Sequence, residues 1–324
     1  MAHSSLGPGL DGILVVAKPT GPTSHDVVAL VRRLAATKRV GHGGTLDPFA
    51  AGVLPVFLGH ATRVVEYHLG DQKAYRATMC FGASSTTDDL EGDLTPADGA
   101  APSKDAVEAA LPALTGPISQ RPPAYSAIKV AGRRAYAMAR AGESITLPSR
   151  DVTIHGLELV DWDGADPDRP VAILDVTCSA GTYVRALARD LGERVGSAAY
   201  LGALTRTASG GFVLADAVSL DDIRTAAAPG PDGLRGLLRP IDVGLERFPE
   251  VALTADEVLA IARGQFVRPA GGLDALAAHF RLRDADGRLV AIAAPAGNGR
   301  LTPEKVFVAP TSADPTAADP APVR

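Results

Sequence analysis

Short hydrophobic runs alternate with segments of helical periodicity in the first third of the chain. Residues Ile13–Val16 are all apolar, which predicts a buried strand. After a turn-rich stretch, apolar residues return at helical spacing up to Leu34, and Ser24 is the expected N-cap of that helix. Lys73–Phe81 alternates between polar and apolar positions, which predicts a strand with one buried face.

The middle of the chain continues this mixture. Ser103 is expected to cap a short helix over Lys104–Leu114, and Val152–Val160 and Val171–Cys178 predict two strands. A helix is expected from Tyr183 to Gly192, because glycine is common where helices end. Since strands and helices mix without a strict βαβ repeat, the pattern predicts the α+β class.

A stretch rich in Gly, Pro and Ala, Ala226–Leu238, is interpreted as a linker. Beyond it, we expect a helix over Ala255–Arg263 and a hairpin whose turn is Asp284–Gly287. The predicted organisation is a flexible leader (1–12), a large domain (13–238), a small β-rich domain (239–309) and a disordered tail (310–324).

Composition and length indicate a globular protein. The chain has 324 residues, of which 46% are hydrophobic and 21% charged. No apolar stretch is long enough to span a bilayer and the first residues lack the pattern of a secretory signal, so no membrane association is expected. The two cysteines, Cys80 and Cys178, lack metal-type spacing, and a cytoplasmic location is expected.

Charge is unevenly distributed around a formal net value of −5. Residues 121–150 contain six Arg or Lys and one Glu, whereas residues 88–108 contain seven Asp or Glu and one Lys. A local basic segment can bind phosphates although the whole chain is acidic, and a solvated charged face is the alternative. We expect Leu90–Pro102 to be an exposed connection.

One carboxylate, Asp47, lies in a run of glycines and prolines, Gly41–Pro55. Pro48 biases Asp47 away from helix, so the run predicts a stiff loop that presents this side chain, although an ordinary turn has the same composition. The sequence has no Walker loop, no dinucleotide fingerprint and no zinc motif, so neither a cofactor nor a metal is expected. Asp47 is then the leading nucleophile or general base.

Five segments occur in order along the chain: Lys18–His25, Gly41–Pro55, Tyr75, Arg121–Lys129 and Cys178–Arg185. Together they resemble the TruB-type bacterial tRNA pseudouridine synthases. The resemblance runs from about Ile13 to Phe212, and Leu301–Phe307 is similar to the small PUA-like RNA-binding domain of such enzymes. Two departures are Ala17, where many relatives carry Asp, and Thr205, where they often carry Arg.

The resemblance implies a pseudouridine synthase fold, with a mixed, largely antiparallel sheet and flanking helices, that isomerises uridine 55 in the T loop of tRNA. It implies a flipped-out uridine, no cofactor, the T-arm of tRNA as partner, no guide RNA and a monomeric enzyme. Asp47 matches the essential aspartate, which either attacks C1′ or C6 or acts first as a base at C2′. Arg185 matches its partner, and Tyr75 matches the tyrosine that stacks on the base.

The resemblance also points to residues that bind substrate. His42 matches a residue that fills the space left by the flipped base, and Tyr183 is expected in the same pocket. Further candidates for substrate contacts are Lys18, Lys129 and Arg133. Three rivals remain: a non-catalytic tRNA-binding or folding module, an N-glycosylase that releases uracil, and a guide-RNA-dependent pseudouridylase.

Overall fold

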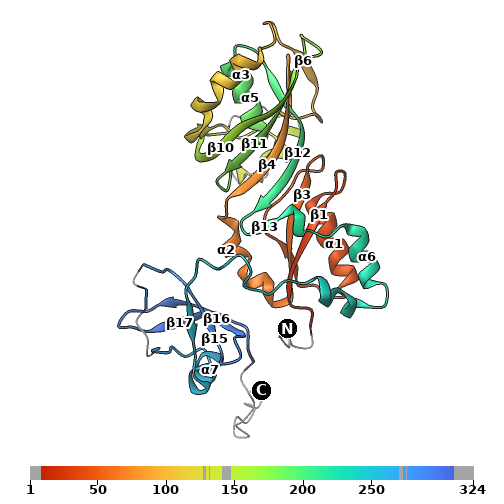
Figure 1. The fold of residues 1–324 in the computed structure, drawn as a ribbon. Coiled ribbons are helices and arrows are strands. Elements are labelled where there is room, and N and C mark those ends of the chain that lie inside the picture. The colour runs from red at the N-terminus through yellow and green to blue at the C-terminus, as the bar shows by residue number, and fades with distance from the viewer. Residues whose placement is uncertain are drawn as a thin grey trace.

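The computed structural model describes residues 9–126, 129–130, 132–140, 147–269, 273–274 and 276–309. Figure 1 shows a long molecule in which one large sheet runs through the upper and middle parts and a second sheet forms the lower part. Across the described residues, no helix is long and apolar enough to cross a membrane.

The large sheet has the strand order β1-β3-β12-β4-β11-β10-β7, with β2 beside β3 and β13 beside β12. All pairs are antiparallel except β3 and β12, which run parallel and pair through Thr205 with Ala51 and Arg206 with Gly52. The strands are β1 Gly12–Lys18, β2 Val40–His42, β3 Ala51–Leu58, β4 Lys73–Phe81, β7 Gly116–Gln120, β10 Arg150–Asp163, β11 Val171–Cys178, β12 Ala199–Ser209 and β13 Phe212–Val213.

Helices and short hairpins complete the large domain. The α-helices are α1 Ser24–Leu34, α2 Val65–Leu69, α3 Lys104–Ala110, α4 Ala135–Arg140, α5 Val184–Arg194 and α6 Leu220–Ala227. The 3₁₀-helices are η1 Gly59–Val64, η2 Leu111–Leu114, η3 Leu214–Asp216 and η4 Pro231–Leu237. Two short antiparallel pairs are β5 Ala83–Ser85 with β6 Leu94–Pro96, and β8 Lys129–Val130 with β9 Arg133–Arg134.

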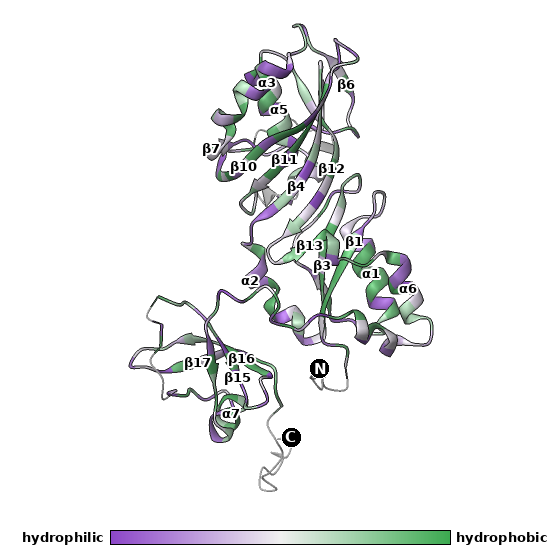
Figure 2. Ribbon diagram, viewed as in Figure 1, coloured by the Kyte–Doolittle hydropathy of each residue, from purple (hydrophilic) through white to green (hydrophobic). Residues whose placement is uncertain are grey.

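Hydrophobic residues lie on both faces of β1 and β3, where Figure 2 shows continuous green ribbon. Leu14 of β1 packs with α1, α6 and η4, whereas its neighbour Ile13 packs on the opposite face with Phe57 of β3. A strand buried on both faces reads as an unbroken apolar run, as in Ile13–Val16. Farther along the sheet, α3 and α5 cover one face of β4, β10, β11 and β12.

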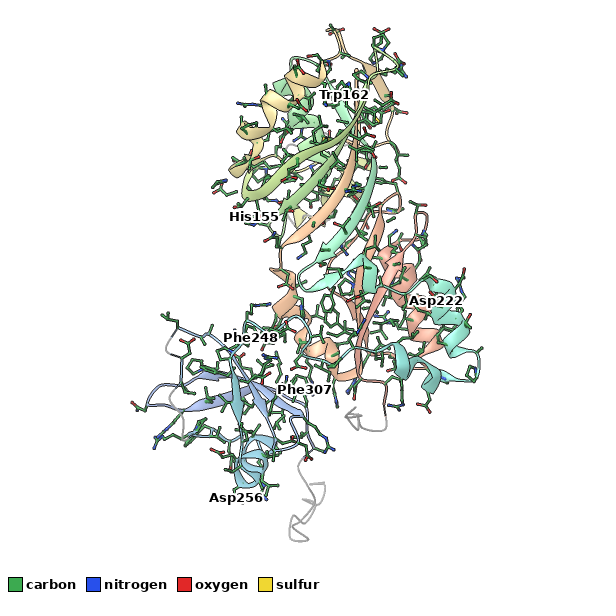
Figure 3. All side chains as sticks on the ribbon, viewed as in Figure 1. His155, Trp162, Asp222, Phe248, Asp256 and Phe307 are labelled. Atoms are coloured by element: carbon green, nitrogen blue, oxygen red, sulfur yellow. The ribbon has the colours of Figure 1, made fainter. Side chains whose placement is uncertain are left out.

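The small sheet contains β14 Glu250–Ala252, β15 Phe280–Arg283, β16 Leu289–Pro295 and β17 Leu301–Val306, with α7 Ala255–Ala262 packed against it. Phe248 and Phe307, labelled in Figure 3, lie where this sheet meets the large domain and pack in one cluster with Ile292. Polar contacts join the same parts: the Tyr67 hydroxyl donates to Glu304 at 3.0 Å, and Lys305 pairs with Glu66 at 2.7 Å.

Most predicted elements are present, including the strand Lys73–Phe81, the Ser103 cap and the hairpin turn. Two helix ends were predicted wrongly. Thr23, not Ser24, caps α1. The Thr23 hydroxyl accepts a hydrogen bond from the Asp26 amide, and the Asp26 carboxylate accepts one from the Thr23 amide. Gly192 lies inside α5, where a Cβ would come within 2.3 Å of the Ala199 backbone, so close packing explains it rather than helix termination.

Two segment interpretations also needed correction. The stretch 226–238 is not a free linker, because η4 occupies most of it and Leu234 is fully buried against the large domain. The run 41–55 is not one loop, since β2 and β3 take up both ends and leave a loop of residues 43–50. The tail after residue 309 and the leader before residue 9 lie outside the described residues.

Candidate active site

The loop of residues 43–50 is held by side chains from β1 and α1. The Ser24 hydroxyl accepts from the Leu46 amide at 2.8 Å and donates to the Leu46 carbonyl at 3.0 Å. The Lys18 ammonium, which is buried, donates to the Ala50 carbonyl at 2.7 Å and to the Pro48 carbonyl at 3.4 Å. These bonds fix the backbone on both sides of Asp47, so its carboxylate is presented from a stiff support.

Arg185, in the first turn of α5, brings three segments together at this carboxylate. Its Nε lies 3.1 Å from Asp47 Oδ2, and a second nitrogen lies 3.1 Å from Asp89 Oδ2. The guanidinium also donates to the carbonyls of Thr87 and Tyr125. Arg185 is therefore buried but has partners for its charge and for its donors.

The environment of Asp47 acts on its protonation in opposite directions. Burial raises the pKa of this carboxyl above its ordinary value of 3.8, and the nearby Asp89 carboxylate raises it further, while Arg185 and Lys18 lower it. Asp47 keeps an exposed fraction of 38% of its side chain, so it remains accessible to a ligand although it is paired.

Asp47 and Arg185 line a cleft of about 730 Å³ together with Tyr75, Tyr125 and Tyr183. This volume lies in the range of sites that hold small molecules. Tyr75 comes from β4, two strands from β3, and its pKa is raised by burial. The cleft thus combines a carboxylate paired with an arginine and several aromatic rings, a set suited to holding and reacting with a flat polar ring.

Tyr183 immediately precedes α5 and is fixed through its backbone. The fully buried Gln120 amide accepts from the Tyr183 amide at 2.9 Å and donates to the Tyr183 carbonyl at 3.1 Å. The Arg150 guanidinium lies 4.5 Å from the centre of the Tyr183 ring. Arg150, one end of the basic segment, therefore covers an aromatic ring of the cleft wall.

The other predicted substrate-binding residues lie outside the cleft wall formed by the described residues. His42 is half-buried on β2 and accepts from the Gly44 amide at 3.3 Å, and burial lowers its pKa. The Lys18 ammonium is occupied by backbone carbonyls. Arg133 is exposed on β9, and the side chain of Lys129 falls outside the described part of the structure.

Two charged residues at the site were missed from the sequence. Asp89 was counted only as part of the acidic run 88–108, yet it is buried and pairs with Arg185, as the adjacent Asp88 pairs with Arg189 at 2.7 Å. The adjacent acids Asp88 and Asp89, together with two arginines four residues apart on α5, could have indicated these ion pairs from the sequence. Arg206 lies on β12, a strand that was not predicted.

Arg206 is the second buried arginine at this site, with an exposed fraction of 1%. It donates to the Val53 carbonyl at 2.7 Å and to the Gly44 carbonyl at 3.2 Å. Its backbone passes so close to Gly52 (φ +111°) that a Cβ there would lie 2.2 Å from the Arg206 carbonyl oxygen. Glycine is therefore required where β3 and β12 meet.

No group of three or more His, Cys, Asp or Glu side chains that could hold a metal occurs among the residues described. The side chains that line the cleft include a paired carboxylate, an arginine and tyrosines.

Family models match most of the large domain. Residues 32–184 match the TruB family pseudouridylate synthase N-terminal domain. Residues 185–246 match the tRNA pseudouridylate synthase B C-terminal domain. The chain belongs to the TruB family. The resemblance inferred from the five sequence segments is thereby confirmed.

Curated TruB relatives cover nearly the whole chain. The tRNA pseudouridine synthase B of Bradyrhizobium diazoefficiens is 42% identical over 299 residues, 91% of this chain and 85% of that protein. The tRNA pseudouridine synthase B of Geobacillus thermodenitrificans is 41% identical over 303 residues, 92% of this chain and 100% of that protein.

A solved structure supports the fold. The chain is similar to the crystal structure of the archaeal box H/ACA sRNP Nop10–Cbf5 complex, with a TM-score of 0.68 and 25% identity over 93% of this chain and 87% of that one. The predicted α+β fold, with a mostly antiparallel sheet, flanking helices and a C-terminal β-rich domain, is confirmed for this TruB chain.

Proposed function

We propose that this chain converts a uridine in the T loop of tRNA, at position 55, to pseudouridine. The observation that carries the proposal is the Asp47 carboxylate, held 3.1 Å from Arg185 in a cleft that Tyr75 and Tyr183 also line. The names of its relatives, tRNA pseudouridine synthase B, support the substrate.

The reaction breaks the N1–C1′ bond of uridine and forms a C5–C1′ bond, while a proton leaves C5 and one is gained at N1. Atoms and electrons balance within the nucleotide, so no oxidant is required. Asp47 acts on the flipped uridine, as the nucleophile at C1′ or C6 or as the base at C2′. Arg185 favours its ionised form against the effect of burial.

The aromatic residues supply the surface for the extruded base. We assign Tyr75 to stacking on the uracil, opposite the carboxylate, and Tyr183 to the adjacent wall. Extruding the base costs a few kcal/mol of base stacking within the RNA. Stacking of the uracil on an aromatic side chain regains roughly 1–3 kcal/mol. His42 is assigned to the space that the base leaves, and Lys18 to supporting the Asp47 loop.

Phosphate contacts are assigned to Lys129 and Arg133, in the basic segment beside the cleft. Binding of tRNA should weaken steeply as salt concentration rises despite the net charge of −5, because phosphate contacts release counterions. An affinity independent of salt would contradict this assignment.

The direct test incubates the purified protein with an unmodified tRNA transcript and maps pseudouridine. The wild-type chain should modify one T-loop uridine, and Asp47→Asn, which keeps the size and loses the charge, should lower the rate by about 10⁴-fold or more. Asp175→Asn is the matched control, since Asp175 lies on the exposed surface of β11 and pairs with Arg76. Activity that survives in Asp47→Asn contradicts the role of this carboxylate.

The same assay separates the rivals. Release of free uracil would identify an N-glycosylase, and binding without product would identify a tRNA-binding module. A requirement for added guide RNA would align the chain with the H/ACA complexes that its fold resembles. We propose a guide-independent, monomeric enzyme, and light scattering of the protein with and without tRNA tests the monomer.

We also propose the division into a catalytic domain over 13–238 and a PUA-like domain over 239–309, and a cytoplasmic location. The separate four-stranded sheet begins at Glu250, which supports a small C-terminal domain. The free thiols of Cys80 and Cys178 fit a reducing compartment.

A further inference from the structure

Arg206 carries a buried positive charge for which the described residues supply no carboxylate partner; the ionisable group that favours its charged form is Tyr75. Lys18, Lys73 and His42, whose pKa values are lowered by burial and by the charge of Arg206, are themselves cationic or basic. A buried charge without a counter-ion is costly, so its retention calls for a specific task.

The contacts of Arg206 connect the two reactive parts of the cleft. One donor reaches the Gly44 carbonyl, before Asp47, and another reaches the Val53 carbonyl, after it. On the sheet, Arg206 of β12 is the direct cross-strand partner of Tyr75 of β4. Directly opposed residues of an antiparallel pair point to the same face, which places the guanidinium beside the tyrosine.

We propose that Arg206 is a positioning residue of this active site, whose guanidinium holds the Tyr75 hydroxyl and the backbone on both sides of Asp47, at Gly44 and Val53, in one arrangement. The inference rests on the proposed function and adds a residue to it. Arg206 does not line the cleft, so it acts on the uridine through Tyr75 and Asp47.

The planar fork of arginine explains why this residue type is needed. Nε and a terminal nitrogen are committed to two carbonyls in different segments, which fixes the plane of the guanidinium and leaves further donors for the tyrosine. Lysine has the charge but only one nitrogen, so it cannot keep all three contacts in fixed directions.

Electrostatics supports the same assignment. Tyr75 faces Arg206 from β12, Cys178 from β11 and Asp47 from the loop. Burial, Cys178 and Asp47 raise the pKa of the Tyr75 hydroxyl, while the charge of Arg206 and its side-chain hydrogen bond lower it. Burial, Cys178 and Asp47 make it harder for the Tyr75 hydroxyl to lose its proton. Arg206 acts in the opposite direction, because its positive charge stabilises the deprotonated form.

The kinetic test compares Arg206→Met, Arg206→Lys and Tyr75→Phe on unmodified tRNA. Arg206→Met should lower kcat by about 100-fold, the usual cost of losing one preorganised donor, with KM changed less than about threefold. Arg206→Lys should be intermediate. Arg76→Met is the matched control, because Arg76 adjoins Tyr75 on β4 but pairs with Asp175 on the exposed surface; it should retain kcat within about twofold.

The double variant decides whether Arg206 acts through Tyr75. In the Tyr75→Phe background, Arg206→Met should cost at least about tenfold less in kcat than in the wild type, because residues in one network are not additive. Equal losses in both backgrounds, or an unchanged kcat in Arg206→Met, would overturn the proposal. Wild-type protein that forms no pseudouridine would contradict the proposed function instead.

A measurement without RNA keeps the inference testable in that event. Arg206→Met should lower the melting temperature by at least about 2 °C more in the wild-type than in the Tyr75→Phe background, because the tyrosine contact is lost only in the former. Identical shifts would overturn the coupling. If Arg206→Met does not fold, the same cycle is carried out with Arg206→Lys, which retains the charge.

Discussion

Two buried arginines support the cleft, and their positive charges are balanced to different degrees. Arg185, on α5, has two carboxylate partners, Asp47 and Asp89. Arg206, on β12, has backbone carbonyls and a tyrosine. The same side chain thus serves as a counter-ion on one side and as an uncompensated charge on the other.

The difference shows how one protein can tune two groups in opposite directions. Arg185 faces an acid that the proposed reaction uses in its ionised form, and the second acid, Asp89, raises the pKa of Asp47 against the effect of Arg185. Arg206 faces a neutral hydroxyl, where a carboxylate partner would cancel the field that the tyrosine experiences. Replacing each arginine is therefore expected to have a different effect on stability and activity.

The largest contrast is expected in stability. Arg185→Met leaves the buried Asp89 without its cation and should lower the free energy of unfolding by about 3–5 kcal/mol. Arg206→Met leaves only neutral groups unpaired, two carbonyls and the Tyr75 hydroxyl, and should cost about 1–2 kcal/mol. Urea unfolding of both variants measures the difference, and equal losses would remove the distinction between the two sides.

Gly52→Ala tests the Arg206 side without changing its charge. The new Cβ would lie 2.2 Å from the Arg206 carbonyl oxygen, and the alanine would have to keep the positive φ of Gly52. We therefore expect the free energy of unfolding to fall by about 2–3 kcal/mol. Gly41→Ala is the control, because a Cβ at that position would have no other atom within 4 Å and the φ of Gly41 is not positive. Thermal unfolding of both proteins provides the comparison; similar melting temperatures would show that β3 and β12 can separate.

Asp89→Asn tests the Arg185 side through pH dependence. Asp47 must be ionised, so kcat/KM should fall as pH drops through the raised pKa of Asp47. Asp89 is one cause of that rise, so its neutralisation should move the acidic limb to lower pH, with a stability loss of about 1–2 kcal/mol. If the acidic limb moves to higher pH, or does not move, Asp89 does not raise the pKa of Asp47 and this prediction is wrong.

The smallest effect is expected for the stability of Asp47→Asn. A carboxyl whose pKa is raised by folding destabilises the native state above that pKa, and this cost disappears as pH falls through it. At neutral pH the variant should therefore be as stable as the wild type or more stable, by less than about 1 kcal/mol, because Asp47 is partly exposed. A clear loss of stability at pH 7 would show that the pair with Arg185 outweighs burial.

The Arg185 side was largely predictable from the sequence, whereas the Arg206 side was not. Asp47 and Arg185 stand in dense motifs of Gly, Pro and Tyr, and these matched a family segment by segment. Residues 199–209 lack clean alternation, because β12 has irregular register opposite β4 near Leu201 and Arg206. An arginine in such a segment is expected at a surface, and only the tertiary pairing shows that it is buried.

The fold was predictable where local signals agree. The strand Lys73–Phe81 follows period-two alternation, and β1 and the α7 cap follow apolar runs and short capping motifs. β3 was missed because Gly52 precedes and Pro55 interrupts its apolar run, and both residues usually mark a loop. Asp89 was missed because its partner is 96 positions away in the sequence.

The parallel contact between β3 and β12 also bears on how the molecule folds. It joins positions 154 residues apart through two residue pairs, whereas the antiparallel neighbours on either side pair along most of their length. Contacts of such long range close late and contribute little until their surroundings are ordered. The arrangement at the cleft should thus be the last to form and the first to open, so amide exchange at Gly52 and Arg206 should precede that of β1 and β4.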